Sequence, residues 1–570
     1  MRTDKRKKSL LLKNGRRVNL FIGEVLRSNL LIYGDRILGI GPNLTAEKEI
    51  DLKGDYILPG LIESHIHLES SLLSPQEFSR LTLLSGTTTL ICDPHEIANV
   101  LGIKGIYYLL RATKNLPQNF YFLIPSCVPA TRFETAGGKI GLKEIRRLLK
   151  EKRILGLAEV MNFPGVISGE KGILAKIRLL QETRSKTRRQ LVIDGHSPGL
   201  RGTGLQTYLA SGISSDHECT SAEEAEEKLR LGMWIMVREG SAAKNLKDLS
   251  PIINEKTQNR LLLCSDDIHP EELSKEGHLN AILRKGVSLG IDPIILLKMA
   301  TYNPANRFGL TDLGAIAPSY RADITIVKEL KEFKVRMVIK DGEIVVKDGE
   351  IIKPFGVSPS FPQSTFKVRD FSQERLFVKN EKKVMKVIKI IPGQILTKRE
   401  LVLPKVKGEE VISDTERDIL KLVVIERHKG TGNIGIGFVQ GFGLKEGAIG
   451  SSVAHDSHNL ILVGVSDEAI FHTAKRIIEM KGGMVVFGRD KREELPLPIA
   501  GLLSDRPVAE VIERLRRMIS LTKELGSPLE NPFATLSFLA LPVIPELKLT
   551  DRGLFDAVRF RFVPLFGDES

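Results

Sequence analysis

Residues 58–67 read LPGLIESHIH, an apolar run that ends in two histidines. His65 and His67 are two positions apart, so on a strand both imidazoles project from the same face. Two imidazoles at one strand end can hold a divalent metal ion. Taken alone, the same pattern is equally typical of two polar strand residues that face solvent, so its meaning depends on the rest of the chain.

Further strand-like apolar runs follow, with helical stretches between them. Together with the first run they lie at 57–67, 87–95, 119–128, 154–162, 190–196, 213–218, 233–238 and 261–267. Alternating strands and helices are typical of a parallel α/β fold. Eight such units within about 250 residues predict a (β/α)8 barrel of the TIM type.

Polar side chains lie at the carboxyl ends of these runs, the face on which barrel enzymes build their active sites. The candidate metal ligands are His65, His67, Glu159, His196, His217 and Asp266; Asp93, His95 and Asp267 lie at the same ends. Four imidazoles and two carboxylates suit Zn, Mn, Fe(II) or Ni rather than Ca or Mg. One hydrolytic metal needs about three protein ligands, so this set predicts two metal ions that share a carboxylate.

The segments on either side of the barrel follow another pattern. Residues 1–56 and 311–356 contain short β-like runs separated by turn signals. We expect them to pair into one small β-sandwich domain that flanks the barrel, residues 57–310. A Ser/Pro-rich stretch at 357–362 marks a boundary, and residues 365–570 are predicted to form a C-terminal α+β domain.

The chain carries an excess of positive charge. Its 570 residues include 84 Lys and Arg against 70 Asp and Glu, which gives a formal net charge of +14. Residues 1–20 contain eight basic residues and one acidic residue, so 8 − 1 = +7 of that excess lies there. Without aromatic side chains for base stacking, this segment is more typical of a solvated terminus than of a nucleic-acid-binding arm.

Cysteine usage and hydropathy favour a cytoplasmic protein without a membrane partner, and the solvated basic terminus favours one without a nucleic-acid partner. The cysteines, at 92, 127, 219 and 264, are far apart and form no CxxC pair, which argues against a disulfide framework or a zinc ribbon. The apolar run at 9–12 is too short for a signal peptide, and no stretch of about 20 uncharged apolar residues occurs.

The motifs, taken in order, resemble a known family. Residues 58–67 are similar to the first-strand signature of the amidohydrolase superfamily, whose barrel is flanked by a small sheet from both sides of the chain. Further blocks resemble the bacterial adenine deaminases: CDPHEIANV at 92–100, AEVMNFPGV at 158–166, SDHECT at 215–220, SDDIHP at 265–270 and HDSHN at 455–459. The resemblance is specific because these blocks match in order over most of the chain.

This resemblance implies hydrolytic deamination of adenine to hypoxanthine and ammonia at a two-metal centre. It implies Mn²⁺ or Fe²⁺ as the metals, with Zn²⁺ as a further option, and adenine and water as the partners of a homodimer. The six candidate ligands would hold the metals. Glu159 would bridge them, since Lys152 and Lys171, the nearest lysines, lie outside the strand end and cannot supply a carboxylated lysine.

The expected catalytic residues are Asp266, Glu159 and His95. Asp266 would carry a proton to the leaving amino group, with Asp267 as its rival because the apolar run 261–264 has no alternation that decides which aspartate faces inward. His95 would donate to a purine nitrogen or move a proton; the alternative is a structural pairing with Asp93.

Candidate substrate-binding residues form a weaker set: Arg238, Ser241, Asp267, His455 and His458. A structural salt bridge is the alternative role for Arg238. The segment 455–458 could form a separate metal site, a lid over the barrel mouth or an ordinary turn, and a lid is favoured because the barrel already supplies a complete ligand set. Glu96, Glu218 and His269 could orient ligands.

Two other functions compete with deamination of adenine. The first is that of another amidohydrolase, acting on a cyclic amide or an N-acyl substrate with the same metals. The second is a non-enzymatic nucleic-acid-binding protein that uses the basic terminus. Metal ligands alone do not identify a substrate, so the preference for the deaminase rests on the resemblance.

Overall fold

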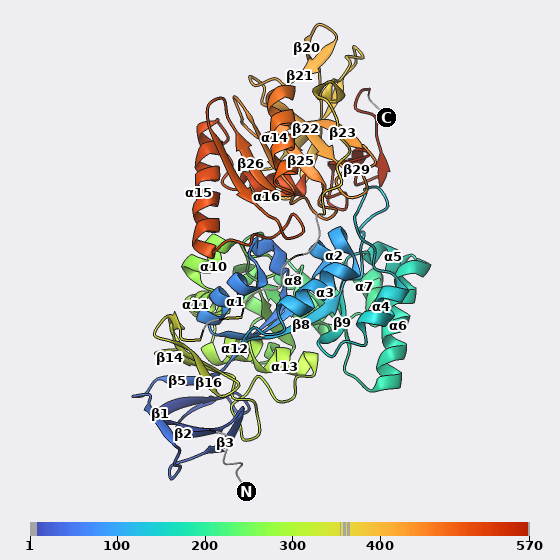
Figure 1. The fold of residues 1–570 in the computed structure, drawn as a ribbon. Coiled ribbons are helices and arrows are strands. Elements are labelled where there is room, and N and C mark those ends of the chain that lie inside the picture. Colours follow the sequence, from blue (N-terminus) through green and yellow to red (C-terminus); the bar gives the residue numbers. More distant parts are fainter. Residues whose placement is uncertain (1–7, 354, 357–360, 362–364, 568–570) are drawn as a thin grey trace.

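The computed structural model describes residues 8–353, 355–356, 361 and 365–567, and three regions follow one another in space (Figure 1). A small sheet-rich module lies at one end, a barrel in the middle and the C-terminal domain at the other end. The first seven residues of the basic segment and most of the Ser/Pro-rich stretch lie outside the described residues.

Eight parallel strands form the barrel, as predicted. They are β6 (Leu61–Ile66), β7 (Thr87–Cys92), β8 (Asn119–Ile124), β9 (Ile154–Val160), β10 (Val192–Gly195), β11 (Ser215–Asp216), β12 (Trp234–Arg238) and β13 (Leu261–Cys264). Strands β6 to β10 pair in chain order, as do β11 to β13, and a bridge between Ile66 and Asp266 joins the first strand to the last. The (β/α)8 prediction is therefore confirmed.

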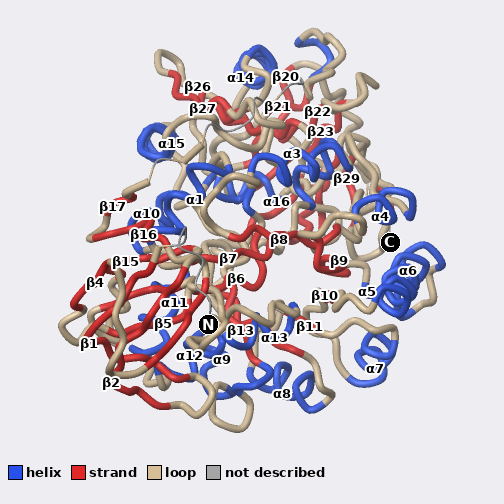
Figure 2. Tube along the Cα trace, turned by 60° about the horizontal axis from the view of Figure 1, so that its bottom comes forward, coloured by secondary structure: helices blue, strands red, loops and turns tan. Residues whose placement is uncertain are grey.

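Helices surround these strands, as Figure 2 shows. They are α1 (Pro75–Leu84), α2 (His95–Leu101), α3 (Ile103–Ala112), α4 (Leu142–Leu148), α5 (Phe163–Ile167), α6 (Lys171–Thr187), α7 (Gly202–Ala210), α8 (Ala222–Arg230), α9 (Leu246–Leu249), α10 (Pro270–Glu276), α11 (Leu279–Ser288), α12 (Pro293–Met299) and α13 (Tyr302–Phe308). Strands β6, β7, β9 and β13 are buried at every position, which explains their continuous apolar runs. Among the described residues, no helix has the length and apolarity that a membrane span requires.

The predicted first barrel strand, 57–67, is wrong at its start. Its first residues belong to β5 (Tyr56–Pro59), which pairs with β14 (Ile324–Val327) in the flanking module. Gly60 separates the two sheets: a Cβ at this position would lie 2.1 Å from Oγ1 of Thr88. Glycine therefore lets the chain pass from one sheet into the other, and the apolar pattern conceals this break.

The flanking module combines both predicted segments in one sheet, in the order β17-β16-β15-β14-β5-β1-β2-β3 with β4 on β1. The further strands are β1 (Ser9–Asn19), β2 (Glu24–Tyr33), β3 (Arg36–Ile40), β4 (Lys48–Asp51), β15 (Val335–Lys340), β16 (Glu343–Lys347) and β17 (Glu350–Ile351). The turn after β15 packs closely against the turn after β2, since a Cβ at Gly342 would collide with the carbonyl oxygen of Gly34. The sheet has an apolar cluster of its own.

The C-terminal domain is built on a sheet in the order β19-β18-β23-β22-β25-β24-β26-β27. Its strands are β18 (Met385–Ile390), β19 (Thr397–Val402), β22 (Ile419–Ile425), β23 (Ile434–Gln440), β24 (Ala448–Ser451), β25 (Leu460–Gly464), β26 (Gly483–Phe487) and β27 (Arg492–Pro496). Smaller strands are β20 (Lys405–Lys407), β21 (Glu410–Ile412), β28 (Leu547–Thr550), β29 (Gly553–Asp556) and β30 (Arg561–Phe562). The helices are α14 (Asp467–Glu479), α15 (Val508–Glu524) and α16 (Pro532–Phe538), so the α+β prediction is confirmed.

The two accessory modules contact opposite ends of the barrel (Figure 1). The flanking sheet lies at the amino ends of the strands, where β5 leads directly into β6 and Thr325 donates a hydrogen bond to the carbonyl of Gly86. The C-terminal domain lies over the carboxyl ends, where the amide of Ser504 donates to the carbonyl of Leu72. The face predicted to carry the active site is therefore covered by the C-terminal domain.

Candidate metal centre

The six predicted ligands converge at the carboxyl end of the barrel. Each lies in or directly after a strand: His65 and His67 at β6, Glu159 in β9, His196 after β10, His217 after β11 and Asp266 after β13. All are buried except His196, whose side chain is 23% exposed. Because the strand ends share one edge, residues that are about two hundred positions apart in the chain meet there.

The first-strand histidines share one carboxylate. Nε2 of His65 and Nε2 of His67 lie 3.1 Å apart, and Oδ1 of Asp266 is 3.4 Å from the former and 3.0 Å from the latter. Asp267 instead accepts a hydrogen bond from the hydroxyl of Ser70. Of the two rival aspartates, Asp266 is therefore the one that faces both histidines.

Glu159 lies between four imidazoles. Its Oε1 is 3.6 Å from Nε2 of His67 and 3.5 Å from Nδ1 of His95, and its Oε2 is 2.7 Å from Nδ1 of His196 and 3.3 Å from Nε2 of His217. Burial acts to raise the pKa of Glu159, but the neighbouring His196 and His217 hold that pKa well below its ordinary value. The carboxylate thus directs one oxygen to each of two imidazole pairs, an arrangement that suits a bridging ligand.

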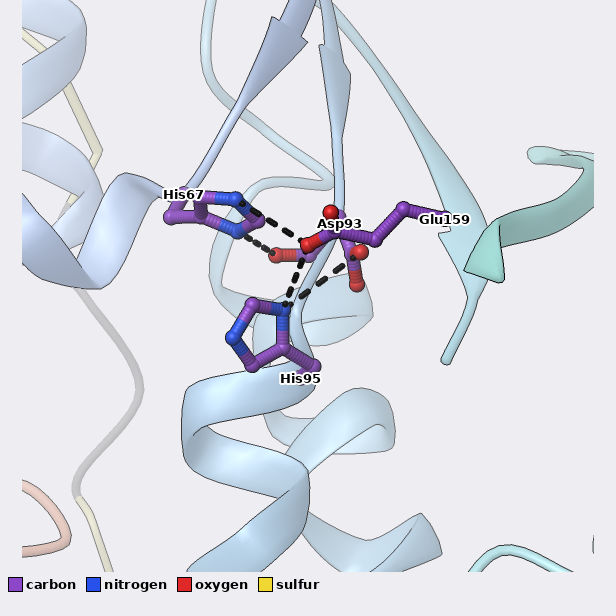
Figure 3. A group of neighbouring side chains, drawn as sticks. All are labelled: His67, Asp93, His95 and Glu159. Carbon is purple, nitrogen blue, oxygen red and sulfur yellow. Dashed lines mark hydrogen bonds and ion pairs between the residues drawn. The ribbon is translucent and has the colours of Figure 1, made fainter. Parts of the chain in front are cut away.

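Asp93 and His95, which follow β7, complete this side of the cluster (Figure 3). Nδ1 of His95 lies 3.5 Å from Oδ2 of Asp93, and Nδ1 of His67 lies 3.1 Å from the backbone oxygen of Asp93. Side-chain atoms of His67, Asp93, His95 and Glu159 are close enough to share one ion. The sequence interpretation gave Asp93 only a structural role. Its spacing of two from His95, the same as that of His65 and His67, is the signal that could have identified it.

The cluster fits a metal centre on its own chemistry. Both carboxylate oxygens of Asp93, Nδ1 of His95 and Nε2 of His217 are buried without a hydrogen-bond partner among the described residues. Buried polar atoms in native proteins are almost always satisfied. Imidazole nitrogens and carboxylate oxygens that converge in this way are the ligands that divalent transition metals prefer.

Arg238 orients one of these ligands. Its Nη1 donates to Oδ2 of Asp266 at 2.8 Å and to Oε1 of Glu218 at 2.5 Å. Burial acts to raise the pKa of Asp266, yet hydrogen bonds from His65 and His67 and the charge of Arg238 hold it well below its ordinary value. The structure thus shows the salt bridge considered for Arg238, which leaves Oδ1 of Asp266 directed at the histidines.

Ser241 has partners of another kind. Its hydroxyl donates to Oε2 of Glu272 at 2.5 Å and accepts from the backbone amide of His269 at 2.9 Å. These contacts anchor the loop after β12 to the loop after β13 and to α10. They place Ser241 in this loop contact rather than among the residues that face Glu159.

The segment 455–458 docks on the barrel through Glu96, in α2. Nδ1 of His455 is 2.7 Å from Oε1 of Glu96, and Nε2 of His458 contacts Oε2 of the same carboxylate. Nε2 of His95 is 3.4 Å from Oε1 of Glu96, so this contact adjoins the cluster. The segment therefore lies over the barrel mouth, where the lid interpretation places it.

The same segment is poorly suited to bind a metal of its own, although Glu96, His455 and His458 are close enough to share an ion. The backbone amide of Ala454 donates to Nδ1 of His458 at 3.2 Å. That nitrogen is therefore an acceptor, and in a neutral imidazole the other nitrogen, Nε2, then carries the proton. A protonated Nε2 donates to Glu96 and cannot ligate an ion.

Comparison with known proteins agrees with this geometry. Residues 56–345 match the model of the amidohydrolase family, and residues 394–561 match that of the adenine deaminase C-terminal domain. The chain is 45% identical over 558 residues to the adenine deaminase of Desulfatibacillum aliphaticivorans, covering 98% of this chain and 97% of that protein. It is 47% identical, with the same coverage, to the adenine deaminase of Methanothrix thermoacetophila.

The chain belongs to the adenine deaminase family of the amidohydrolases. Among solved structures, a β-aspartyl dipeptidase of Fervidobacterium islandicum AW-1 aligns with a TM-score of 0.48 at 17% identity, over 62% of this chain and 99% of that one. A triazine hydrolase aligns with a TM-score of 0.47 at 15% identity, over 60% of this chain and 96% of that one. The family assignment rests on the models and the full-length relatives.

Two buried residues that hold the strands of the metal ligands in place were not predicted from the sequence. Glu63, buried in β6, accepts hydrogen bonds from the amides of His65 and Ser265 and so ties the first strand to the last. Lys228, fully buried in α8, donates to Asp216, the neighbour of His217, at 3.0 Å. A lysine in a helix rich in glutamates reads as a solvent-exposed residue, so the sequence pattern offers no signal for this one.

Proposed function

We propose that this protein is an adenine deaminase that hydrolyses adenine to hypoxanthine and ammonia at a centre of two divalent metal ions. The observation that carries the proposal is that the two oxygens of Glu159 face two different imidazole pairs. The chain also matches proteins named adenine deaminase over nearly its full length. A carboxylate between two imidazole pairs can serve as a ligand that two metal ions share.

Six residues would hold the two ions: His65, His67, Asp266, Glu159, His196 and His217. Asp93 adds a carboxylate on the side of His67. We propose Mn²⁺ or Fe²⁺, with Zn²⁺ as the alternative, because the donors are imidazole nitrogens and carboxylate oxygens without any thiolate. When bound, such ions lower the pKa of water toward neutrality and offset the negative charge that develops on the substrate.

Asp266 is proposed to move the proton. Arg238 holds its Oδ2, so Oδ1, which lies beside His65 and His67, is the oxygen proposed to accept a proton from the attacking water and to deliver it to the amino group that leaves C6. His95, between Asp93 and Glu159, is proposed to donate a hydrogen bond to a ring nitrogen of the base. Burial of both groups excludes bulk water from the proton transfer.

The test is an assay of ammonia release from adenine, adenosine, cytosine and guanine, with metal analysis of the purified protein. We expect hypoxanthine from adenine, little ammonia from the other three compounds, and about two transition-metal ions per chain. Activity after reconstitution of the metal-free protein with Mn²⁺, Fe²⁺ or Zn²⁺ ranks the ions. Absence of hypoxanthine with a fully loaded centre overturns the proposal in favour of another amidohydrolase reaction.

The cellular setting belongs to the same proposal. We propose a cytoplasmic homodimer, and the four buried, unpaired cysteines fit the reducing conditions of the cytoplasm. Light scattering on the metal-loaded protein tests the dimer, and a monomeric mass contradicts it.

A further inference from the structure

Two buried carboxyl side chains near the metal centre have no role in the mechanism above. Asp456 and Glu134 are each 4% exposed. Oδ2 of Asp456 lacks a hydrogen-bond partner among the described residues. Leaving a polar group buried and unpaired costs several kcal/mol, so a native site with such groups indicates a ligand that pairs with them.

Asp456 belongs to the C-terminal domain but faces the barrel. Nδ1 of its neighbour His455 lies 2.7 Å from Oε1 of Glu96, and that oxygen lies 3.4 Å from Nε2 of His95 in the metal cluster. Glu134, in the loop after β8, interacts with Asp456 from the barrel side. Burial and the neighbouring Asp456 raise the pKa of Glu134 to about 8. The backbone oxygen of Thr135, next to Glu134, accepts a hydrogen bond from Nδ2 of Asn459 at 3.0 Å, so each domain contributes one buried carboxyl group to this junction.

The segment that carries Asp456 is held firmly. His455 and His458, on either side of it, both contact Glu96. From within the C-terminal domain, Nε2 of His428 lies 2.6 Å from the backbone oxygen of Ser457. Groups fixed in this way before a ligand arrives lose little conformational entropy on binding, which is the property of a recognition residue.

Adenine offers two kinds of hydrogen-bond donor. One is the 6-amino group, which must face the metal centre because it leaves from C6. The other is the single N–H of the five-membered ring. We propose that Asp456 accepts this ring N–H and thereby selects the free base over nucleosides, an inference that rests on the proposed adenine deaminase function. A purine substituted at N9 has no ring N–H, so it leaves the Asp456 carboxylate unpaired.

The experiment compares adenine with 9-methyladenine in the metal-loaded wild type and in Asp456→Asn and Asp456→Ala. A hydrogen bond to a charged group corresponds to about a tenfold to hundredfold effect on kcat/KM. We expect the wild type to prefer adenine by about this factor. In Asp456→Ala the kcat/KM for adenine falls by the same factor while that for 9-methyladenine stays within about threefold, so the preference disappears.

Asp456→Asn separates hydrogen bonding from shape, because asparagine keeps the size of aspartate and an acceptor oxygen but loses the charge. Its preference is expected to fall between those of the wild type and Asp456→Ala. The matched control is Asp505→Ala, which replaces an exposed aspartate of the same domain. It should leave kcat/KM for both substrates unchanged. Asp456→Asn also serves as the test if Asp456→Ala does not fold.

Several results overturn the inference. An equal fall for both substrates would place Asp456 elsewhere on the base, and a rise for 9-methyladenine alone would make the preference steric. Loss of metal from Asp456→Asn would make the residue a support of the centre instead of a substrate-binding residue. Failure of the underlying function is distinguishable, since wild-type protein would then release no hypoxanthine from adenine.

Discussion

The flanking sheet and the C-terminal domain both pack on the barrel, but they contact opposite ends and contribute different chemistry. At the amino ends, Asp323 pairs with Lys340 of its own sheet and accepts a hydrogen bond from Asn119 at the start of β8, at the end of the barrel opposite the metal cluster. At the carboxyl ends, Glu96 joins the C-terminal domain to the surroundings of His95. Both junctions contain a buried carboxylate, yet only the second adjoins the reacting groups. An accessory module can therefore support the fold alone or complete the site.

The largest expected effect comes from a change in the barrel, which lies between the two modules and contains the proposed metal ligands. Glu159→Gln removes the proposed bridging charge, so we expect the metal content to fall from two ions to one or none. Activity on adenine should fall by more than about a thousandfold, beyond the ten- to hundredfold typical of residues that only orient ligands. Elemental analysis and the ammonia assay measure both changes.

The matched control for this variant is Glu182→Gln, an exposed glutamate of α6 whose side chain is 64% exposed. It should keep both metals and full activity. A Glu159→Gln protein that retains two ions and near-normal turnover would contradict the bridging role and would move the centre to the group of His67, Asp93 and His95.

The next effect compares the two junctions directly. Glu96→Gln weakens the contact of α2 with His455 and His458, so we expect kcat for adenine to fall by about ten- to hundredfold with both metals retained. Asp323→Asn weakens the buried pair with Lys340 inside the flanking sheet and the contact with Asn119 of the barrel. It should lower the free energy of unfolding by about 1 to 3 kcal/mol with kcat unchanged, because Lys340 keeps Asp341 as a partner. Steady-state kinetics and urea unfolding of both variants provide the measurements.

Equal behaviour of the two variants would remove the distinction between the modules. If Glu96→Gln lowers only stability, the C-terminal domain is a cover without influence on the chemistry. If Asp323→Asn lowers kcat as much as Glu96→Gln does, the flanking sheet acts on the site through the barrel strands.

Local sequence patterns explain which parts of this arrangement could be predicted. The eight strands and their terminal ligands follow from short apolar runs that end in histidines or carboxylates, because parallel strands bring their ends to one edge. The break at Gly60 was missed because apolar residues continue across it, and only the close approach of Thr88 reveals it.

The contacts between domains could not be predicted in this way. Glu96 and His458 are 362 positions apart, and no periodicity in either segment reports the partner. The motif around His455 and His458 indicated a functional segment. Its contact with Glu96 and the burial of Asp456 depend on how the two domains pack.

The smallest expected effect concerns the pH dependence of stability that a buried lysine gives to the C-terminal domain. Lys548 of the C-terminal domain is buried, its Nζ donates to the carbonyls of Ile395 and Phe538, and burial lowers its pKa to about 7. Between about pH 7 and 10 the unfolded chain binds a proton at this lysine that the folded chain lacks, so the contribution of Lys548 to the free energy of unfolding rises with pH.

In Lys548→Met this contribution is absent, so the free energy of unfolding should rise less steeply with pH than in the wild type, by up to about 1.4 kcal/mol per pH unit. Urea unfolding at pH 7, 8 and 9 measures the difference, and Lys186→Met, an exposed lysine of α6, should follow the wild-type slope. Parallel pH curves for wild type and Lys548→Met would show that the buried lysine stays protonated, and would leave the C-terminal domain with no pH dependence from this residue.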